Sequence, residues 1–153
     1  MNQAQSNFSS ITLEEYPEVV DLWEASVRAT HNFLSEKDIQ HYKPLILNQY
    51  LHMVELVCLR DTELRIVGFA GVSANKLEML FIAPERRGQG IGKRLLQHTI
   101  KEMGITDVDV NEQNEQAVGF YLHAGFEIIK RSPLDGQGNP FPILHLRLPS
   151  PKQ

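Results

Sequence analysis

A glycine-rich segment between a predicted strand and a predicted helix constrains this chain more than any other feature. The segment runs Arg86–Arg87–Gly88–Gln89–Gly90–Ile91–Gly92–Lys93. Glycines at alternate positions leave the backbone free of side chains, so several N–H groups can point at one ligand. The following helix adds the unpaired N–H groups and the positive dipole end of its first turn. The sequence therefore predicts an anion-binding site, with the arginines and the lysine adding positive charge.

Two common phosphate-binding loops do not fit this spacing. A dinucleotide-binding fingerprint, Gly-x-Gly-x-x-Gly, would start at Gly88 and need a glycine in place of Lys93. A P-loop, Gly-x-x-x-x-Gly-Lys-Ser/Thr, would need a glycine in place of Arg87 and a hydroxyl residue in place of Arg94. Nicotinamide dinucleotides and nucleoside triphosphates are therefore disfavoured as ligands of this loop.

The composition indicates a single domain over residues 1–153, because 153 residues of which 42% are hydrophobic suit one folded core. We expect the polar ends, residues 1–7 and 149–153, to be flexible. A formal net charge of −4 argues against a nucleic-acid partner. No segment has the apolar length of a membrane span or the pattern of a signal peptide, and Cys58 is the one cysteine. The cytoplasm is therefore the expected compartment, with no membrane partner.

The order of hydrophobic patterns and turn signals predicts an α/β fold, with a mixed, mostly antiparallel sheet flanked by helices. Strands are expected at 8–13, 53–59, 66–73, 76–83, 105–110, 126–130 and 143–148. Helices are expected at 13–28, from 35 onward, at 90–103 and at 114–124. Ser35, followed three residues later by Asp38, is expected to start the second helix, which should break or kink at Pro44.

Two motifs resemble those of the GNAT superfamily of N-acetyltransferases, and they occur in that family's order and separation. The first is Arg-x-x-Gly-x-Gly, formed by Arg87, Gly90 and Gly92. The second runs Asn114-x-x-Ala117-x-x-Phe120–Tyr121-x-x-x-Gly125–Phe126. In a helix, Asn114, Ala117 and Tyr121 would share one face, where the small alanine lets a thin chain pass. The segments 28–34 and 111–117 further resemble a subgroup of small bacterial GNAT proteins whose acceptor is undefined.

The resemblance implies a GNAT-like acyl-CoA N-acyltransferase fold and acetyl-CoA as acetyl donor. In that family the glycine loop binds the CoA pyrophosphate, and a splayed strand offers backbone N–H groups to the thioester. Carried onto this sequence, the cofactor-binding residues are Leu80, Phe81, Ile82, Arg87, Gly88, Gln89, Gly90, Ile91, Gly92, Lys93, Asn114, Ala117 and Tyr121. The implied function is direct attack of a primary amine on the thioester. The alternative is a CoA- or acyl-CoA-binding sensor with little catalysis.

Tyr121 and Glu78 are the candidate catalytic residues. Tyr121 matches the family's usual general acid, but a free phenol has a pKa of about 10 and a thiol about 8.5, so full proton transfer to a thiolate is uphill by about 2 kcal/mol. Either the site lowers the phenol pKa, or Tyr121 stabilises the sulfur mainly by hydrogen bonding. Glu78 should share a strand face with Leu80 and Ile82, and it is either the base for the amine or a surface carboxylate.

The acceptor is a small-molecule amine or a protein amino group. His31 and Phe33 occupy the place where this family often forms an acceptor wall, between the first two helices. Asn111 is expected to orient CoA amides or the acceptor, or else to cap the next helix. No metal is expected, because His41, His98, His123 and His145 lack ligand spacing and should lie at the surface or in packing. The resemblance leaves both a monomer and a homodimer open.

Overall fold

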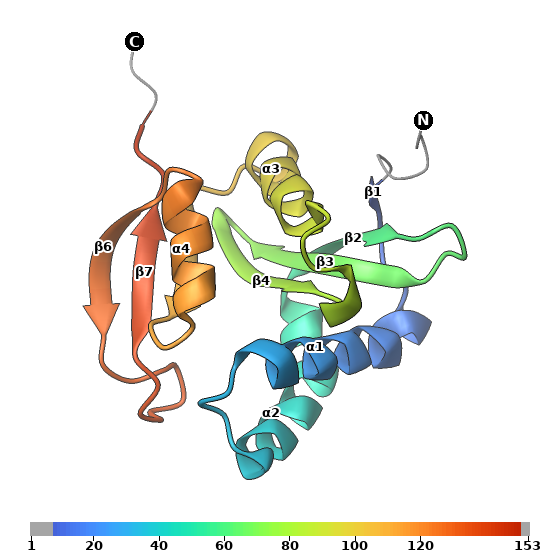
Figure 1. Cartoon of the computed structure of the whole chain (residues 1–153), viewed down its shortest axis with the longest axis horizontal. Coiled ribbons are helices and arrows are strands. Elements are labelled where there is room, and N and C mark those ends of the chain that lie inside the picture. The colour runs from blue at the N-terminus through green and yellow to red at the C-terminus, as the bar shows by residue number, and fades with distance from the viewer. Residues whose placement is uncertain (1–7, 151–153) are drawn as a thin grey trace.

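A seven-stranded sheet forms the centre of the structure, a computed structural model that describes residues 8–150 (Figure 1). The strands are β1 (Phe8–Ser9), β2 (Glu55–Arg60), β3 (Ile66–Ser73), β4 (Lys76–Ile82), β5 (Asp107–Asn111), β6 (Glu127–Ser132) and β7 (Ile143–Arg147). Their order is β1-β2-β3-β4-β5-β7-β6, and among these described strands only β4 and β5 pair in parallel. The predicted mixed, mostly antiparallel sheet is confirmed.

Helices cover both faces of the sheet. They are α1 (Tyr16–Thr30), α2 (Glu36–Asn48), α3 (Ile91–Met103) and α4 (Glu115–His123), with short 3-10 helices at Leu13–Glu15, Tyr50–Met53 and Pro84–Arg86. Figure 1 shows α1 and α2 on one side of the central strands and α3 on the other. Each side has its own buried cluster: Trp23 and Phe69 belong to the one beneath α1 and α2, and Leu95 and Leu146 to the one beneath α3 and α4. The sheet therefore separates two cores.

The second helix begins as predicted but does not break. The Asp38 N–H donates to Ser35 Oγ at 3.1 Å, and the Ser35 N–H donates to Asp38 Oδ2 at 2.9 Å, which is a complete capping box. Of the break or kink predicted at Pro44, the break is wrong, because α2 continues to Asn48. Ile39 and Ile46, on either side of the proline, are both buried. Their packing against the core holds the helix together despite the missing proline N–H.

Several element ends differ from the predicted ones. β1 contains only Phe8–Ser9, and the residues expected to begin the first helix form the 3-10 helix Leu13–Glu15. Of the ends predicted to be flexible, 1–7 and 149–153, residues 1–7 and 151–153 lie outside the described residues, and Pro149 and Ser150 are exposed.

Close packing of α3 on β3 fixes where the glycine loop lies. A Cβ added at Gly68 in β3 would be 2.8 Å from Ile91 Cγ2 and 3.1 Å from Leu95 Cδ1. Gly68 therefore lets the first turn of α3 approach the sheet more closely than a larger residue would. This contact places the start of α3 over the end of β4.

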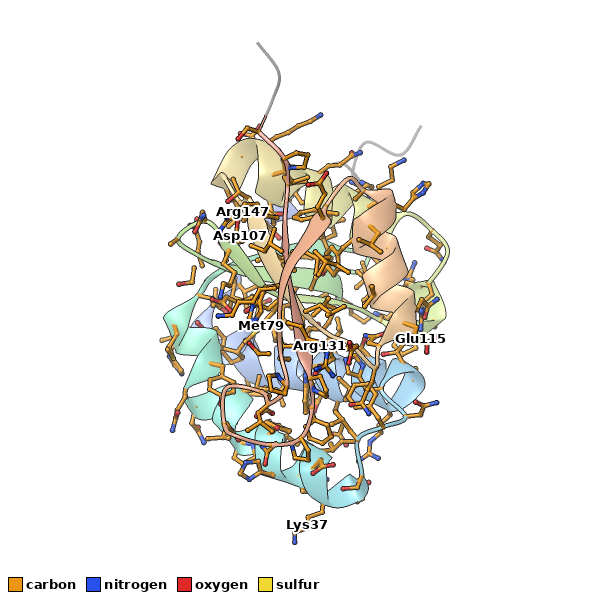
Figure 2. All side chains as sticks on the ribbon, turned by 90° about the vertical axis from the view of Figure 1, so that its left-hand side faces the viewer. Lys37, Met79, Asp107, Glu115, Arg131 and Arg147 are labelled. Carbon is orange, nitrogen blue, oxygen red and sulfur yellow. The ribbon has the colours of Figure 1, made fainter. Side chains whose placement is uncertain are left out.

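The sheet opens between β4 and β5. These strands pair only at Lys76 with Asp107 and at Leu77 with Val108, whereas β5 pairs with β7 along its whole length. Seen from the β6–β7 side, Figure 2 shows Asp107 and Arg147 together near the joined end and Met79 further along β4. Beyond Leu77, the β4 edge that faces β5 has no strand partner among the described residues.

Candidate active site

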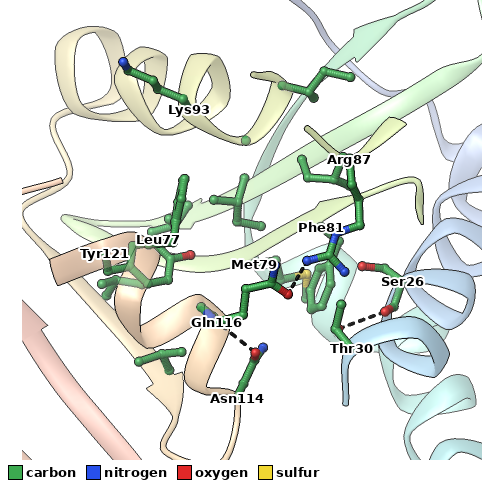
Figure 3. A pocket seen from close by; sticks show the side chains of 18 of the residues that line it. Ser26, Thr30, Leu77, Met79, Phe81, Arg87, Lys93, Asn114, Gln116 and Tyr121 are labelled. Carbon is green, nitrogen blue, oxygen red and sulfur yellow. Dashed lines mark hydrogen bonds between the residues drawn. The ribbon is translucent and has the colours of Figure 1, made fainter. Parts of the chain in front are cut away.

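A cavity of about 410 Å³ lies where β4 and β5 separate. It is lined by residues of both strands, of the glycine loop and first turn of α3, of α4 and of the end of α1. Figure 3 shows Arg87, Met79, Gln116 and Tyr121 around this space. Segments far apart in the sequence therefore meet in one cleft.

The glycine loop presents free backbone donors to this cleft. Gly88 and Gly90 have φ angles of +81° and +80°, a left-handed conformation that other residues adopt at a cost. An added Cβ at either glycine would meet no atom within 4 Å, so the backbone angles rather than crowding demand glycine. Within residues 8–150, the N–H groups of residues 88–93 donate no hydrogen bond, and the first one in α3 is from Arg94 to the Gly90 carbonyl at 3.0 Å. This row of donors at a helix start fits an anionic pyrophosphate.

Positive side chains surround the loop. Lys93 and Arg87 line the cavity, and the Arg87 guanidinium donates to Gln116 Oε1, which joins the loop to α4. Arg86 also lines the cavity but forms an ion pair with Asp61 at 3.1 Å. Arg87 and Lys93 therefore carry the positive charge most readily available to an anion here.

Tyr121 lies on α4 with only 6% of its surface exposed. Its ring packs edge-on against Phe120 and Phe126, with centroid distances of 5.1 and 5.8 Å. Figure 3 shows its hydroxyl turned toward the cavity, and no hydrogen bond to that hydroxyl occurs among the described side chains. Burial raises the pKa of the Tyr121 phenol well above its usual value. The phenol is thus a neutral group able to donate a hydrogen bond.

A hydrogen-bonded chain joins the end of α1 to the start of α4. The Thr30 hydroxyl donates to the Ser26 carbonyl at 2.9 Å, so His31 Nδ1, 2.7 Å away, must donate to Thr30. His31 Nε2 then accepts from Asn114 Nδ2 at 3.3 Å, and Asn114 Oδ1 accepts from the Ala117 N–H at 3.2 Å. Burial lowers the pKa of His31 to about 4. His31 is therefore a neutral wall residue with both ring nitrogens engaged.

Glu78 lines the cavity at a β-bulge, and the strict alternation predicted for its strand is wrong. Gly71 is opposite Met79 but Val72 is opposite Leu77, so Glu78 is the extra residue of β4. Leu77 consequently packs with Leu80 and Ile82 on one side of the sheet. The Glu78 side chain remains exposed, yet partial desolvation raises its pKa, the charge of Asp109 adds to this, and Lys76 opposes it.

The remaining sequence-predicted residues divide into two groups. Residues in the cavity wall include Leu80, Phe81, Ile82, Gly88, Gly90, Ile91, Gly92, Asn111, Asn114 and Ala117. Gln89 and Phe33 are not in that wall. Gln89 is exposed on the loop, and Phe33 packs beside His31 and Phe141, with centroid distances of 5.2 and 5.9 Å.

Sequence reasoning missed Asp109 and Gln116, which both line the cavity. The signal for Asp109 was available: it alternates with Val108 and Val110, which are buried, and so points away from their core. The partnership of Gln116 with Arg87 gave no sequence signal, because it depends on how α4 docks against the loop.

Residues 8–150 contain no group of three or more His, Cys, Asp or Glu side chains arranged to hold a metal ion. None of the helices there has the length and apolar character needed to cross a membrane.

Comparisons with known proteins converge on one family. A family model described as an acetyltransferase (GNAT) domain matches residues 21–141. The chain is 39% identical over 133 residues to the peptidyl-lysine N-acetyltransferase YjaB of Escherichia coli, covering 87% of this chain and 90% of that protein. It is 38% identical over 136 residues to the protein of the same name from Salmonella typhimurium, covering 89% of this chain and 93% of that protein.

Solved structures of N-acetyltransferases also match this fold. The solution structure of apo-form YjaB from Escherichia coli matches with a TM-score of 0.81 and 36% identity, covering 92% of this chain and 95% of that one. The PaiA N-acetyltransferase of Thermoplasma acidophilum, solved in complex with coenzyme A, shares the fold with a TM-score of 0.69 and 21% identity, covering 92% of this chain and 98% of that one. The chain therefore belongs to the GNAT acetyltransferases, and it is an acetyl-CoA-dependent N-acetyltransferase.

Proposed function

We propose that this enzyme acetylates the ε-amino group of lysine side chains in proteins. The observation that carries the proposal is that Tyr121 on α4 and Glu78 on β4 line the same cleft, so a hydrogen-bond donor and a carboxylate flank one reaction space. The relatives with 38–39% identity are peptidyl-lysine N-acetyltransferases, which supports the same acceptor class here.

The donor half of the cleft would be built by the glycine loop and α4. The free N–H groups of residues 88–93 and the charge of Arg87 suit the pyrophosphate of acetyl-CoA. Asn114 and Ala117 line the channel that would take its thin pantetheine arm, and Leu80–Ile82 lie on the unpaired β4 edge. Bound acetyl-CoA supplies the activated acetyl thioester, and the chain orients it.

Tyr121 acts as a hydrogen-bond donor to the departing sulfur. Of the two routes open from the sequence, a lowered phenol pKa or hydrogen bonding, the structure favours the second, because burial raises the pKa of Tyr121. Full transfer of the phenol proton to a thiolate is then even less favourable than the difference of about 2 kcal/mol between free groups. A neutral phenol facing the cleft can still stabilise charge that develops on the sulfur.

Glu78 serves as the base for the amine. A lysine side chain has a pKa of about 10.4, so it is almost entirely charged near neutral pH and must lose a proton before attack. The raised pKa of Glu78 makes it a better proton acceptor than an ordinary surface glutamate. Its place at the bulge, in the cleft wall, suits that role.

An aromatic row beside the cleft would hold the lysine stem. His31 lies 6.3 Å from Phe81 and 5.2 Å from Phe33, and Phe33 lies 5.9 Å from Phe141, between ring centroids. The methylene groups of a lysine side chain pack well on such surfaces while the charged end remains solvated. Asn111, in the cleft wall, would orient the acceptor.

We further propose a single domain that works in the cytoplasm. Both core clusters share one sheet, which supports one domain. Cys58 is a free, buried thiol, a state typical of proteins from reducing compartments.

A peptide experiment tests the acceptor. A peptide with a free α-amine and one internal lysine is incubated with the enzyme and acetyl-CoA, and the acetylated nitrogen is located by mass spectrometry. We expect one acetyl group on the lysine ε-nitrogen, and one molecule of CoA thiol released for each acetyl group transferred. Acetylation confined to the α-amine, or transfer to free polyamines but to no peptide, would refute the proposed acceptor.

A further inference from the structure

The cleft holds a second carboxylate, Asp109, which the roles above leave unused. Asp109 lies between Val108 and Val110 in β5, and both valines belong to the core beneath α3 and α4. Because side chains alternate along a strand, Asp109 faces the opposite side of the sheet. It lines the cavity, and 27% of its side chain is exposed. A ligand in the cleft can therefore reach it.

Asp109 is the centre of a row of polar side chains that crosses β4, β5, β7 and β6. Lys76 Nζ lies 3.0 Å from Asp109 Oδ2, and His145 Nδ1 lies 2.7 Å from Asp109 Oδ1. Ser132 Oγ lies 2.7 Å from His145 Nε2. The register of β5 and β7 sets Asp109 directly opposite His145. Strand pairing therefore holds the row in place.

The row fixes the Asp109 carboxylate in one orientation. A carboxylate only accepts hydrogen bonds, so His145 Nδ1 donates to it. The other ring nitrogen, Nε2, is hydrogen-bonded to the Ser132 hydroxyl, so the imidazole is held from both sides. Each Asp109 oxygen thus receives one hydrogen bond from the row, whereas a carboxylate offers about four acceptor positions. The remaining positions are available to a ligand.

The two carboxylates of the cleft differ in their surroundings. Asp109 is paired with the Lys76 ammonium at 3.0 Å, so its carboxylate already holds one alkylammonium group. No hydrogen bond to Glu78 is present among the described residues, and partial desolvation raises its pKa. The neighbouring carboxylates Asp107 and Glu112 are each paired with an arginine, Arg147 and Arg131, and neither lies in the cavity wall. Carboxylates held so differently are suited to different tasks.

We propose that Asp109 recognises the acceptor, its carboxylate binding the positively charged amine as that amine enters the cleft. His145 and Lys76 position the carboxylate, and Glu78 is left to take the proton. Asp109 has this role only if the acceptor is a cationic amine, as in the function proposed above. The enzyme would then select charged alkylamines over uncharged nucleophiles of the same length.

Two matched peptides separate recognition from catalysis. Both have a blocked N-terminus; one carries a lysine, and the other an aminooxy side chain of the same length, which is uncharged at the assay pH. We expect Asp109→Asn to raise the KM of the lysine peptide about 10- to 100-fold, because a hydrogen bond to a charged group is lost. The Kd of that peptide for the enzyme–CoA complex, measured by calorimetry, should rise equally. The KM of acetyl-CoA and that of the aminooxy peptide should change little.

Control variants test the position and the charge. Asp107→Asn removes a carboxylate from the same strand face, one that is paired with Arg147 and lies outside the cavity wall, and should leave both peptides unaffected. Asp109→Glu keeps the charge and should keep the preference for lysine. His145→Ala should raise the lysine-peptide KM a few-fold without changing kcat. His145→Asn, whose amide can replace the Nδ1 donor, should restore the lower KM.

The outcomes are distinguishable. If the wild-type enzyme acetylates no lysine peptide, the proposed function fails. If it does, but Asp109→Asn leaves the lysine-peptide KM and Kd unchanged or weakens both peptides equally, Asp109 does not recognise the charged amine. If Asp109→Glu loses the preference for the lysine peptide as completely as Asp109→Asn does, the negative charge at position 109 is not what selects the acceptor.

Discussion

Burial shifts the pKa values of Tyr121 and His31 in opposite directions, and in both cases it favours the neutral form of the side chain. It raises the pKa of the Tyr121 phenol and lowers that of the His31 imidazole to about 4, so both groups are neutral near pH 7. Neutral donors and acceptors of fixed direction suit a site that must place a thioester and an amine together. Glu78, left without a hydrogen bond, is the group whose charge is free to change.

Replacing Tyr121 with phenylalanine should slow catalysis with little effect on binding. The ring packing against Phe120 and Phe126 is kept, so folding and acetyl-CoA affinity should be nearly unchanged. General acid groups contribute about 100-fold or more, and for this weak acid we expect about 100-fold or somewhat less, mainly in kcat. Steady-state kinetics measure the loss. Tyr16→Phe, at a tyrosine outside the cavity wall, is the control, and wild-type kcat in Tyr121→Phe with chemistry rate-limiting would make Tyr121 purely structural.

His31 should make stability depend on pH between pH 6.5 and pH 4. The folded pKa of about 4 lies below the ordinary value of 6.5, so as pH falls the unfolded chain binds the proton first. Stability that is present above pH 6.5 is therefore lost toward pH 4, by about 3 kcal/mol for this shift. Urea unfolding of wild type and His31→Gln across this range measures the difference. Parallel curves for the two proteins would contradict the lowered pKa of His31.

At the scale of elements, the start of α3 and the end of β4 form one wall of the cleft, the wall that we propose holds the donor. Gly68 lets α3 approach β3, and in the loop with left-handed Gly88 and Gly90 the N–H groups of residues 88–93 have no partner among the described residues. The same loop continues into the dipole end of α3. The backbone N–H groups of the glycine loop are thus available to a ligand, because they make no hydrogen bond within the described chain.

Gly90→Val should weaken acetyl-CoA binding beyond its effect on stability. A β-branched residue at φ +80° is strained by about 1–2 kcal/mol, and its side chain would project beside the free N–H groups. Gly104, at the other end of α3 with φ +71° and equally open space, provides a matched control. Gly90→Val and Gly104→Val should lower the free energy of unfolding by similar amounts. Only Gly90→Val should weaken acetyl-CoA binding, by about tenfold or more as measured by calorimetry. Equal acetyl-CoA affinity in both variants would mean that the loop does not hold the cofactor.

The elements show what the sequence could and could not predict. The glycine turn before α3, the Ser35 capping box and the succession of helices and strands along the chain follow from local signals, and each is found in the structure. The bulge at Glu78 depends on pairing with β3, and the continuity of α2 through Pro44 depends on packing of Ile39 and Ile46. The alternation of Asp109 with two buried valines was a local signal, but the contact of Gln116 with Arg87 and the polar row from Asp109 to Ser132 arise where distant segments meet, which no single segment specifies.

At the scale of the whole molecule, the gap between β4 and β5 forms a cavity that is open to both faces of the sheet. The cavity is lined by Leu77 and Ile82, which pack beneath α3 and α4, and by Met79 and Phe81, which pack beneath α1 and α2. A donor held from the α3 side and an acceptor entering beside α1 would therefore meet at the split.

Amide hydrogen exchange with and without acetyl-CoA would show which segments of the enzyme hold the cofactor. The N–H groups of residues 88–93 have no partner within the described chain, so they should exchange quickly in the free enzyme. We predict that acetyl-CoA slows exchange there, along β4 from residue 78 to 82 and at the start of α4, and far less elsewhere. Unchanged exchange in residues 88–93 at saturating acetyl-CoA, or protection concentrated at the separate hollow formed by Phe8, Arg94 and His98, would contradict the placement of the active site.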